Sequence, residues 1–281
     1  MARVNPARVL GVLLLLVMAA GCGPTGVPRA REGTLLRKVQ DRGRLIVGVK
    51  HGHPTFGYRD PKTHAVNGFD PAVGREIAAH IFGEQERVEF TETITRDRIP
   101  FLQSGRVDVV LSTMTITEER LKQIEFSVVY YVAGQRLLVP KGSPIKGVAD
   151  LDGKRVATTR DSTAELNLRK QNGVKVVLFD THSEGVQALL RGEVDAESTD
   201  DTTLYGLALL NPGLEVVGAP FSYEPYGAGI ASGHPEFLEL VNSVIRKLKT
   251  SSRWKEIWKA EIGERLGIFT TPEPPPDDWR R

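Results

Sequence analysis

Hydroxyl side chains follow one short apolar run, Val107–Leu111. Its β-branched residues come directly after a turn signal and predict a buried strand. Ser112, Thr113 and Thr115 begin where the apolar run stops. We therefore expect these three residues at the end of a strand, where polar side chains can reach a ligand.

A cationic side chain comes next. Thr117, followed by Glu118 and Glu119, is typical of a helix N-cap with acids in the first turn, which places Arg120 about one turn inside that helix. Hydroxyls, free helix N–H groups and a guanidinium suit a carboxylate, because an arginine fork binds both oxygens together. The alternative is an ordinary surface arginine at the start of a helix.

This arrangement occurs twice in the chain. Leu189–Asp195 repeats the Leu-x-x-Gly-x-Val-Asp pattern of Leu102–Asp108, and it too precedes a polar run, Ser198–Asp201. The second copy is acidic, and Asp200 is its candidate partner for an ammonium group. Two similar halves with opposite charges indicate two lobes facing one cleft and a receptor for an α-amino-acid zwitterion.

The elements that must position these residues alternate between strands and helices, which predicts an α/β fold. Predicted strands include Arg44–Lys50, Val88–Thr93, Arg155–Thr159, Val174–Phe179 and Leu214–Val217. Predicted helices include Pro71–Phe82, Asp97–Gln103, Ser183–Leu190, Asp201–Leu210 and Pro235–Thr250.

The start of the chain predicts export. Arg3 and Arg8 precede a short apolar run, Val9–Ala20, which indicates a signal peptide rather than a spanning helix. Small residues lead to Cys22, the one cysteine of the protein, as in a bacterial lipoprotein cleavage box. We expect residues 1–21 to be removed, Cys22 to be lipidated, and residues 22–34 to form a flexible spacer.

Charge and composition exclude some functions. The chain has 37 Lys and Arg against 35 Asp and Glu, and the segment 1–21 removes two basic residues, so the mature chain is formally neutral. This argues against a nucleic-acid partner, which calls for a basic surface. The proline-rich segment 271–281 is predicted to be a disordered tail.

The chain resembles family 3 of the extracytoplasmic solute-binding proteins, the receptors of polar amino-acid ABC importers, in several segments that occur in the same order. These segments are LIVGVK, PTFGYRD, NGFDPAVGREIA, DRIPFLQSGRVDVVLSTMTITEERLKQIEFSVVYY, LLVPKGSPI, LDGKRVAT, ALLRGEVDAESTD and YGAGIA. The resemblance implies a two-lobe periplasmic-binding-protein fold of type II, with the ligand in the cleft between the lobes.

The resemblance also implies how the chain is divided. Residues 35–139 and 227–270 would form the first lobe and residues 140–226 the second. Two crossing strands near Leu138–Gly142 and Tyr226–Ala231 would act as the hinge. We expect a monomeric, lipid-anchored extracytoplasmic receptor that needs no cofactor and delivers its ligand to an ABC permease.

The site residues carried over by the resemblance bind a zwitterion. Arg120 and Thr115 would hold the α-carboxylate, with further bonds from Ser112 or Thr113 and from Ser162 and Thr163 of the second lobe. Asp200 would take the α-ammonium, and the ring of Phe56 would cover the ligand. For Phe56 the alternative is a core aromatic.

Specificity depends on three further residues. In relatives that bind glutamate or aspartate, basic groups stand where Lys50, Arg98 and His182 stand here. They would meet a second carboxylate, and each charge-assisted bond contributes roughly 1.5–3 kcal/mol. We therefore expect an acidic amino acid. Glutamine or asparagine is the nearest alternative, although the sequence identifies no acceptor for an amide.

The chain departs from the family pattern at two places. Asp161 stands where relatives usually have glycine, and its carboxylate would either repel an acidic ligand or point outward. Ala72 replaces an acid common after Gly-Phe-Asp, so Asp70 remains alone, with an expected structural role.

Other chemistries are weaker alternatives. His51 and His53 could ligate a metal, but no further ligands have a recognisable spacing. Ser162, His182 and Asp200 could form a hydrolytic triad, but no nucleophile-elbow pattern surrounds Ser162. Some proteins of this fold are dehydratases of prephenate or arogenate, and a loaded receptor could also report to a membrane sensor.

Overall fold

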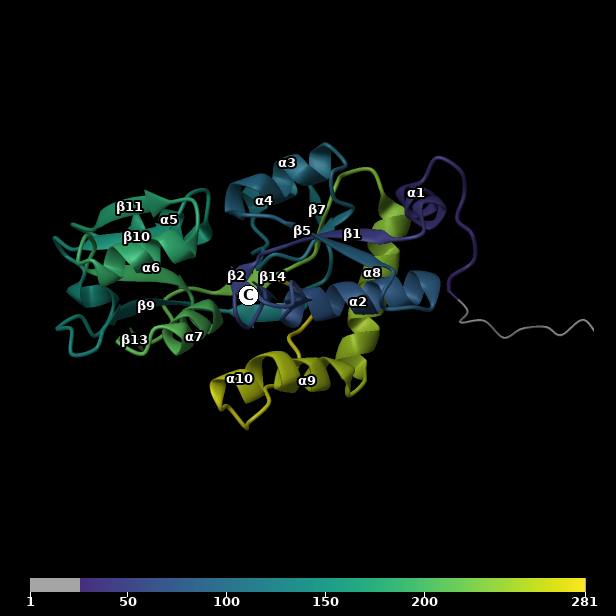
Figure 1. Ribbon diagram of the computed structural model, residues 1–281. Helices are drawn as coiled ribbons and strands as arrows, with labels where there is room; N and C mark the ends of the chain where they lie inside the picture. Colours follow the sequence, from purple (N-terminus) through teal and green to yellow (C-terminus); the bar gives the residue numbers. More distant parts are fainter. Residues whose placement is uncertain (1–25, 281) are drawn as a thin grey trace, which may run out of the picture.

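Two α/β lobes, each built around a five-stranded sheet, make up the described part of the chain (Figure 1). The computed structural model describes residues 26–280, so the predicted signal peptide and Cys22 lie outside the described residues. The sheet of the first lobe has the order β5-β1-β6-β15-β7. Its strands are β1 (Leu45–Val49), β5 (Val88–Glu92), β6 (Val109–Val110), β7 (Glu125–Phe126) and β15 (Gly229–Ile230).

The sheet of the second lobe has the order β11-β10-β12-β9-β13. Its strands are β9 (Gln135–Pro140), β10 (Arg155–Thr159), β11 (Lys175–Phe179), β12 (Ala196–Asp200) and β13 (Leu214–Val217). β10 runs parallel to β11 and β12, whereas β9 is antiparallel to β12 and β13. The predicted α/β class is confirmed in both lobes.

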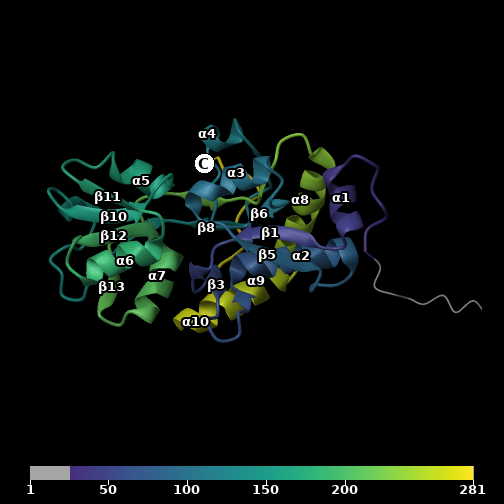
Figure 2. The ribbon, with the colours of Figure 1, turned by 45° about the horizontal axis from the view of Figure 1, so that its top comes forward.

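The lobes are joined by a separate two-stranded sheet, β8 (Tyr131–Ala133) and β14 (Glu224–Tyr226) (Figures 1 and 2). The predicted hinge near Leu138–Gly142 is wrong, because those residues belong to β9 and the turn after it. The predicted lobe boundary between residues 139 and 140 therefore falls inside β9. The predicted hinge strand Tyr226–Ala231 is in fact two elements, the end of β14 and then β15 in the first sheet.

Helices cover both faces of each sheet. The first lobe carries α1 (Leu35–Arg42), α2 (Phe69–Phe82), α3 (Arg98–Gln103), α4 (Glu118–Leu121), α8 (Pro235–Thr250), α9 (Arg253–Trp258) and α10 (Glu264–Leu266). The second carries α5 (Thr163–Leu168), α6 (His182–Leu190) and α7 (Asp201–Leu210). Between residues 26 and 280, no helix combines the length and apolar character that a membrane crossing requires.

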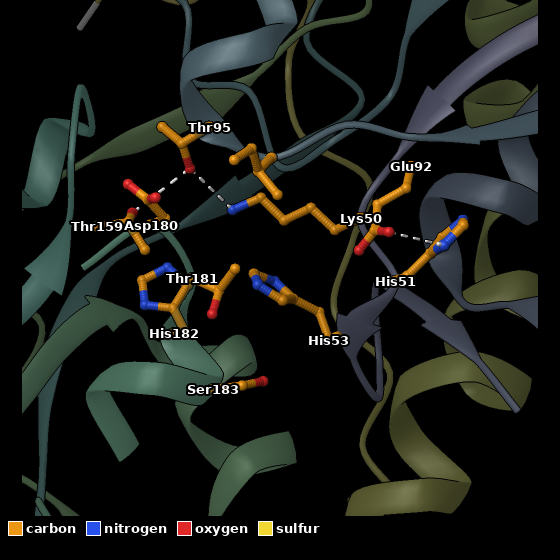
Figure 3. A pocket seen from close by; sticks show the side chains of 12 residues that line it. Lys50, His51, His53, Glu92, Thr95, Thr159, Asp180, Thr181, His182 and Ser183 are labelled. Atoms are coloured by element: carbon orange, nitrogen blue, oxygen red, sulfur yellow. Dashed lines mark hydrogen bonds and ion pairs between the residues drawn. The ribbon is translucent and has the colours of Figure 1, made fainter. Parts of the chain in front are cut away.

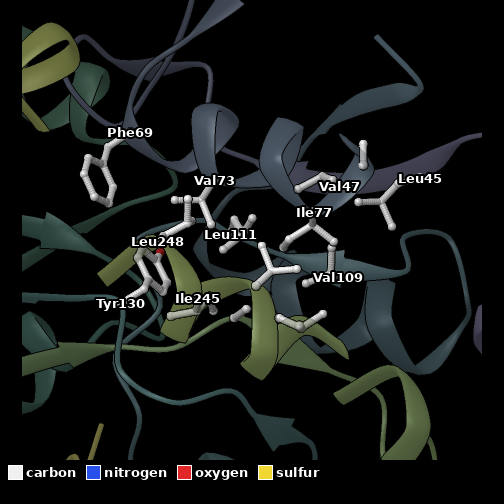
Figure 4. Close-up of a cluster of buried hydrophobic side chains, with 14 of the residues drawn as sticks. Leu45, Val47, Phe69, Val73, Ile77, Val109, Leu111, Tyr130, Ile245 and Leu248 are labelled. Atoms are coloured by element: carbon white, nitrogen blue, oxygen red, sulfur yellow. The ribbon is translucent and has the colours of Figure 1, made fainter. Parts of the chain in front are cut away.

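The largest core lies between the first sheet and helices α2 and α8 (Figure 4). Val73 and Ile77 of α2 pack there with Val47 of β1 and Ile245 of α8. All four side chains are buried, as expected for the apolar stripe of an amphipathic helix against a sheet. This packing fixes the end of β1, from which Lys50 enters the cleft.

The repeated motif builds the same local structure twice. Gly105 and Gly192 each have a positive φ, 69° and 71°, which favours glycine at the turn before the strand. The aspartate that ends each motif then accepts a backbone N–H at the start of a neighbouring strand, at 2.8 Å in both lobes. Asp108 accepts from Ile46, and Asp195 accepts from Arg155.

A small sheet of β2 (Gly52–His53), β3 (Gly57–Arg59) and β4 (Val66–Asn67) continues from β1 toward the second lobe. The remaining regular segments are short 3-10 turns at Thr95–Asp97 and Val148–Asp150 and a π-helical turn at Lys259–Gly263. The turn at Thr95–Asp97 leads into α3 and borders the cleft.

Two segments predicted to be flexible or disordered are packed on the first lobe. In the spacer, Val27 donates its N–H to the carbonyl of Ile81 at 3.2 Å. In the tail, the carbonyl of Asp277 accepts the N–H of Val129 at 3.1 Å, and Lys249 donates to the carbonyl of Pro275 at 3.1 Å. Such bonds tie the described parts of both segments, residues 26–34 and 271–280, to the lobe, and composition does not reveal them.

Candidate functional site

Nine of the eleven predicted ligand-binding residues line one cavity between the lobes, which we call the inner cavity. Its volume is about 20 Å³. The predicted residues in its wall are Lys50, Arg98, Thr113, Thr115, Arg120, Ser162, Thr163, His182 and Asp200, and the others are Thr95, Thr159, Ala164 and Thr199. A volume of this size holds little more than one water molecule, so an amino acid does not fit within the inner cavity alone.

Arg120 lies at the first-lobe side of the inner cavity. Thr117 caps α4 as predicted, because its hydroxyl accepts the N–H of Arg120 at 3.2 Å. The guanidinium donates to the carbonyl of Thr115 at 2.7 Å and, across the cleft, to that of Asp161 at 3.3 Å. These two bonds fix the plane of the fork and leave its other N–H groups for a carboxylate.

Arg98 is held mainly by backbone carbonyls. Its Nε donates to Thr95 at 3.0 Å, and its Nη1 donates to Ser112 and Thr113 at 3.2 Å each. Of the two alternatives Ser112 and Thr113, only Thr113 lines the cavity, because the hydroxyl of Ser112 is buried outside it and donates to the carbonyl of Thr93 at 3.0 Å. Ser112 thus contributes a carbonyl that positions Arg98.

Thr113 reaches the cavity through an uncommon backbone conformation, with φ 45°. Its N–H donates to Asp70 Oδ2 at 2.9 Å, and Asp70 Oδ1 accepts the hydroxyl of Tyr130 at 2.7 Å. Burial raises the pKa of Asp70 to about 7. Asp70 therefore has the structural role expected of it, which is to hold the loop that carries Thr113.

Glu224 is a buried acid beside the cavity that the sequence did not identify. It lies on the crossing strand β14, and its Oε2 accepts the hydroxyls of Thr115 from the first lobe and Thr163 from the second, at 2.7 Å each. Its Oε1 accepts from Gln135 at 2.9 Å. Both threonine hydroxyls thus donate to Glu224 within the protein, and their direct bonds to a ligand stay a prediction.

Ser162 and Asp161 form the start of α5. The hydroxyl of Ser162 accepts the N–H of Glu165 at 3.0 Å as the helix cap and donates to the carbonyl of Thr159 at 2.6 Å. Asp161 has φ 58°, which is the conformation that glycine adopts most easily. The side chain of Asp161 is exposed and does not line the inner cavity, so its carboxylate points outward.

Asp200 lies at the end of β12, on the second-lobe side of the cavity. It is buried and accepts the hydroxyl of Tyr226. Burial, with the nearby carboxylate of Glu224, raises the pKa of Asp200 to about 7. A bound ammonium would stabilise the ionised form, so the position suits a cationic group of a ligand.

Lys50 is buried, and its Nζ donates only a long bond, 3.4 Å, to the hydroxyl of Thr95 (Figure 3). Burial and the charge of Arg98 lower the pKa of Lys50 to about 7. An anion placed against Nζ would raise that pKa again and restore the full charge.

His182 lines the inner cavity and also a larger one of about 240 Å³, which we call the outer cavity. In the outer cavity His53 of the first lobe faces His182 of the second, with ring centroids 5.2 Å apart (Figure 3). Nδ1 of His182 lies 2.7 Å from Oε1 of Glu197. Glu197 is a second buried acid that the sequence analysis missed.

Phe56 is a core aromatic, and its predicted place over the ligand is wrong. The ring is fully buried and lines neither cavity. It packs edge-on against Tyr131 and Tyr226 of the crossing strands, with centroids 4.8 and 5.7 Å away. It thus supports the crossing strands from the first lobe.

Comparison with known families identifies the fold. Residues 45–264 match the family described as bacterial extracellular solute-binding proteins, family 3. The chain belongs to this family. The family resemblance and the type II binding-protein fold expected from the sequence are both confirmed.

Individual relatives differ in the ligand that their names give. The ABC transporter glutamine-binding protein GlnH of Bacillus subtilis (strain 168) is 36% identical over 258 residues, covering 90% of this chain and 94% of the relative. The glutamate/aspartate import solute-binding protein of Salmonella typhimurium is 30% identical over 267 residues, covering 89% and 88%.

Among solved structures, the solute receptor for L-cysteine of Neisseria gonorrhoeae is similar, with a TM-score of 0.80 and 28% identity. The match covers 85% of this chain and 97% of that one. These relatives are solute-binding receptors of transporters, so the present chain is a receptor and not an enzyme.

The geometry of this receptor gives no support to the hydrolytic or metal alternatives. Ser162, His182 and Asp200 bond to three different partners, respectively the carbonyl of Thr159, Glu197 and Tyr226. From residue 26 to residue 280, no three His, Cys, Asp or Glu side chains come together as metal ligands.

Proposed function

We propose that the protein binds glutamate between its two lobes and delivers it to an ABC permease. The relatives named above bind amino acids, and the present chain is an amino-acid receptor of the same kind. The choice of glutamate within that class is the proposal. Aspartate, with the same two charges and a shorter side chain, is the related ligand.

The charge of the inner cavity carries this proposal. Three cationic side chains line it, Lys50, Arg98 and Arg120, against the one carboxylate of Asp200. A zwitterion uses Arg120 and Asp200, and it leaves Lys50 and the remaining N–H groups of Arg98 without an anion. A second carboxylate on the ligand supplies that anion, and glutamate has one.

The test is calorimetric titration of the receptor after it has been unfolded and refolded to remove bound ligand. Lys50→Met should weaken glutamate binding about 10- to 150-fold, because a charge-assisted bond of roughly 1.5–3 kcal/mol is lost, and should change glutamine binding less. The exposed Lys62 offers a matched control, Lys62→Met, which should change neither. An equal loss for both ligands in Lys50→Met would refute the proposed role of Lys50.

Glutamine is the second candidate. The Bacillus relative, with 36% identity over nine-tenths of the chain, is a glutamine-binding protein. In a receptor specific for glutamine, the same titration would give tight binding of glutamine and weak binding of glutamate at every pH.

We further propose that lipidated Cys22 anchors a monomeric receptor to the outside of the membrane, beside its permease. Cys22 follows the apolar run Val9–Ala20, and an anchor keeps a receptor close to the transporter it serves. Cys22→Ala should release the protein from the membrane fraction or leave it unprocessed. Unchanged attachment of this variant would refute the anchor.

A further inference from the structure

Glu197 and His182 form a buried acid–imidazole pair between β12 and α6. Glu197 on β12 is 0% exposed and His182 on α6 is 3% exposed. Oε1 of Glu197 lies 2.7 Å from Nδ1 of His182, while Oε2 has no hydrogen-bond partner within residues 26–280. A Cβ at Gly185 would lie 2.1 Å from Oε2, so glycine at this position makes room for the carboxyl group.

The other nitrogen of the same ring, Nε2, is left for a ligand. His182 lines both the inner and the outer cavity, and only its Nδ1 bonds to a side chain of the described chain. A ligand side chain that reaches past Lys50 in the inner cavity therefore contacts Nε2 of His182. Whether that nitrogen donates or accepts depends on the protons that the pair holds.

The Glu197–His182 pair can hold one proton, with a net charge of −1, or two protons, with no net charge. With one proton, the carboxylate of Glu197 can only accept, so Nδ1 carries the hydrogen and Nε2 presents a lone pair. With a second proton on the pair, Nε2 carries a hydrogen and donates. A carboxamide N–H₂ needs the first arrangement and a carboxylate needs the second.

We propose that Glu197 and His182 together read the end of the ligand side chain, and that the pair holds one more proton with glutamate bound than with glutamine bound. The proposal rests on the proposed function, since it concerns the same site. His182 contacts the ligand, and Glu197 is a positioning residue that acts through His182. The pair would let one receptor accept both ligands, and the extra proton comes from solvent.

Burial favours the second proton on the pair near neutral pH, as a neutral carboxyl group beside a neutral imidazole. Burial raises the pKa of Glu197 well above its usual value, and burial with the charges of Lys50 and Arg98 holds the pKa of His182 well below its own. The titratable and charged groups that share a cavity with His182 are, from the first lobe, Lys50, His51, His53, Glu92, Arg98 and Arg120 and, from the second, Asp180 and Asp200.

A difference of one proton has a measurable consequence. The ratio of the glutamate to the glutamine dissociation constant should rise by up to about tenfold per pH unit as pH increases, because glutamate loses its donor. Lys50 adds to the same trend, since its pKa is about 7. The variant Lys50→Arg keeps a fixed charge at this position and therefore isolates the contribution of the pair.

The experiment is calorimetry at pH 7 in two buffers with different ionisation enthalpies, which counts the protons taken up with each ligand. In Lys50→Arg, glutamate should take up about one proton more than glutamine. Adding Glu197→Gln should lower this difference by about one, because an amide both donates and accepts and His182 then stays neutral with either ligand. If Glu197→Gln only disturbs the structure, the affinities for glutamate and glutamine both fall and the difference in proton uptake between the two ligands remains.

Each outcome has a distinct meaning. Equal proton counts for both ligands, a difference that persists in Glu197→Gln, or binding of only one of the two ligands at every pH would overturn the inference and leave the receptor function intact. Failure of both ligands to bind the receptor that keeps Lys50 would overturn the proposed function itself. If Glu197→Gln does not fold, the pH dependence of the affinity ratio in Lys50→Arg alone still decides, because a ratio that does not change with pH in that variant would overturn the inference.

Discussion

Replacement of Arg120 by alanine should raise the dissociation constant for glutamate about 10²- to 10⁴-fold. The guanidinium uses two of its donors on the carbonyls of Thr115 and Asp161, at 2.7 and 3.3 Å, and these bonds orient the remaining donors toward the inner cavity. Two charge-assisted bonds to an α-carboxylate contribute roughly 3–6 kcal/mol, which gives the expected range. Glutamine should lose the same factor, because its α-carboxylate is identical.

The assay is titration calorimetry with a matched arginine control. Arg96 also lies in the first lobe and also reaches across the cleft, where its Nη1 lies 2.7 Å from Asp180. The Arg96 side chain is 49% exposed, so Arg96→Ala should cost less than about 1 kcal/mol, or about fivefold in affinity. A loss of less than tenfold in Arg120→Ala would refute the assignment of Arg120 to the α-carboxylate.

Three further predictions concern other parts of the chain. Glu224→Gln should weaken glutamate binding about 5- to 150-fold, because Oε2 accepts both threonine hydroxyls and an amide nitrogen in its place removes that acceptor, at about 1–3 kcal/mol. An unchanged affinity would contradict this. The pKa of Lys50 is about 7 in the folded protein against 10.5 in the unfolded chain, which lowers the unfolding free energy by at most about 5 kcal/mol below pH 7, and this loss fades as pH rises to 10.5. Lys50→Met should therefore flatten the rise in unfolding free energy between pH 7 and pH 10, measured by urea unfolding. An equal rise in the variant and the unchanged protein would contradict this. Removal of residues 272–281 should lower the unfolding free energy by about 1–3 kcal/mol with little change in affinity, because the Lys249 side chain, which is 7% exposed, loses the Pro275 carbonyl and the Asp277 carboxylate. An unaltered urea midpoint would show that the tail does not stabilise the lobe.

The sequence predicted elements whose apolar pattern is local. The helix expected at Pro71–Phe82 is α2, and the strand expected at Arg155–Thr159 is β10. The N-cap at Thr117 was also predicted, because capping depends on residues three positions apart. Patterns of this range need no knowledge of the tertiary structure.

Features that depend on distant partners were missed or misassigned. The sequence does not distinguish a phenylalanine that covers a ligand from one in the core, and Phe56 is identified as a core residue by its packing on Tyr131 and Tyr226. Glu197 lies in a short polar segment and Glu224 between Tyr223 and Pro225, and nothing local shows that each acid is buried against residues of other elements.

The hinge was misplaced for a similar reason. β9 is an apolar strand long enough to cross between lobes, and only its pairing with β12 and β13 assigns it to the second sheet. The true crossing strands have three residues each, too few for a pattern to distinguish them from a loop.

The strand order of the first sheet affects how the protein is made. β15 lies between β6 and β7, yet it follows the whole second lobe in the chain. A chain emerging from its N-terminus can therefore complete the second sheet at Val217 while β7 has no neighbour and β6 is paired only with β1. During this interval the unpaired strand edges are exposed to pairing with other chains, and the exported protein remains vulnerable to aggregation until Gly229 arrives.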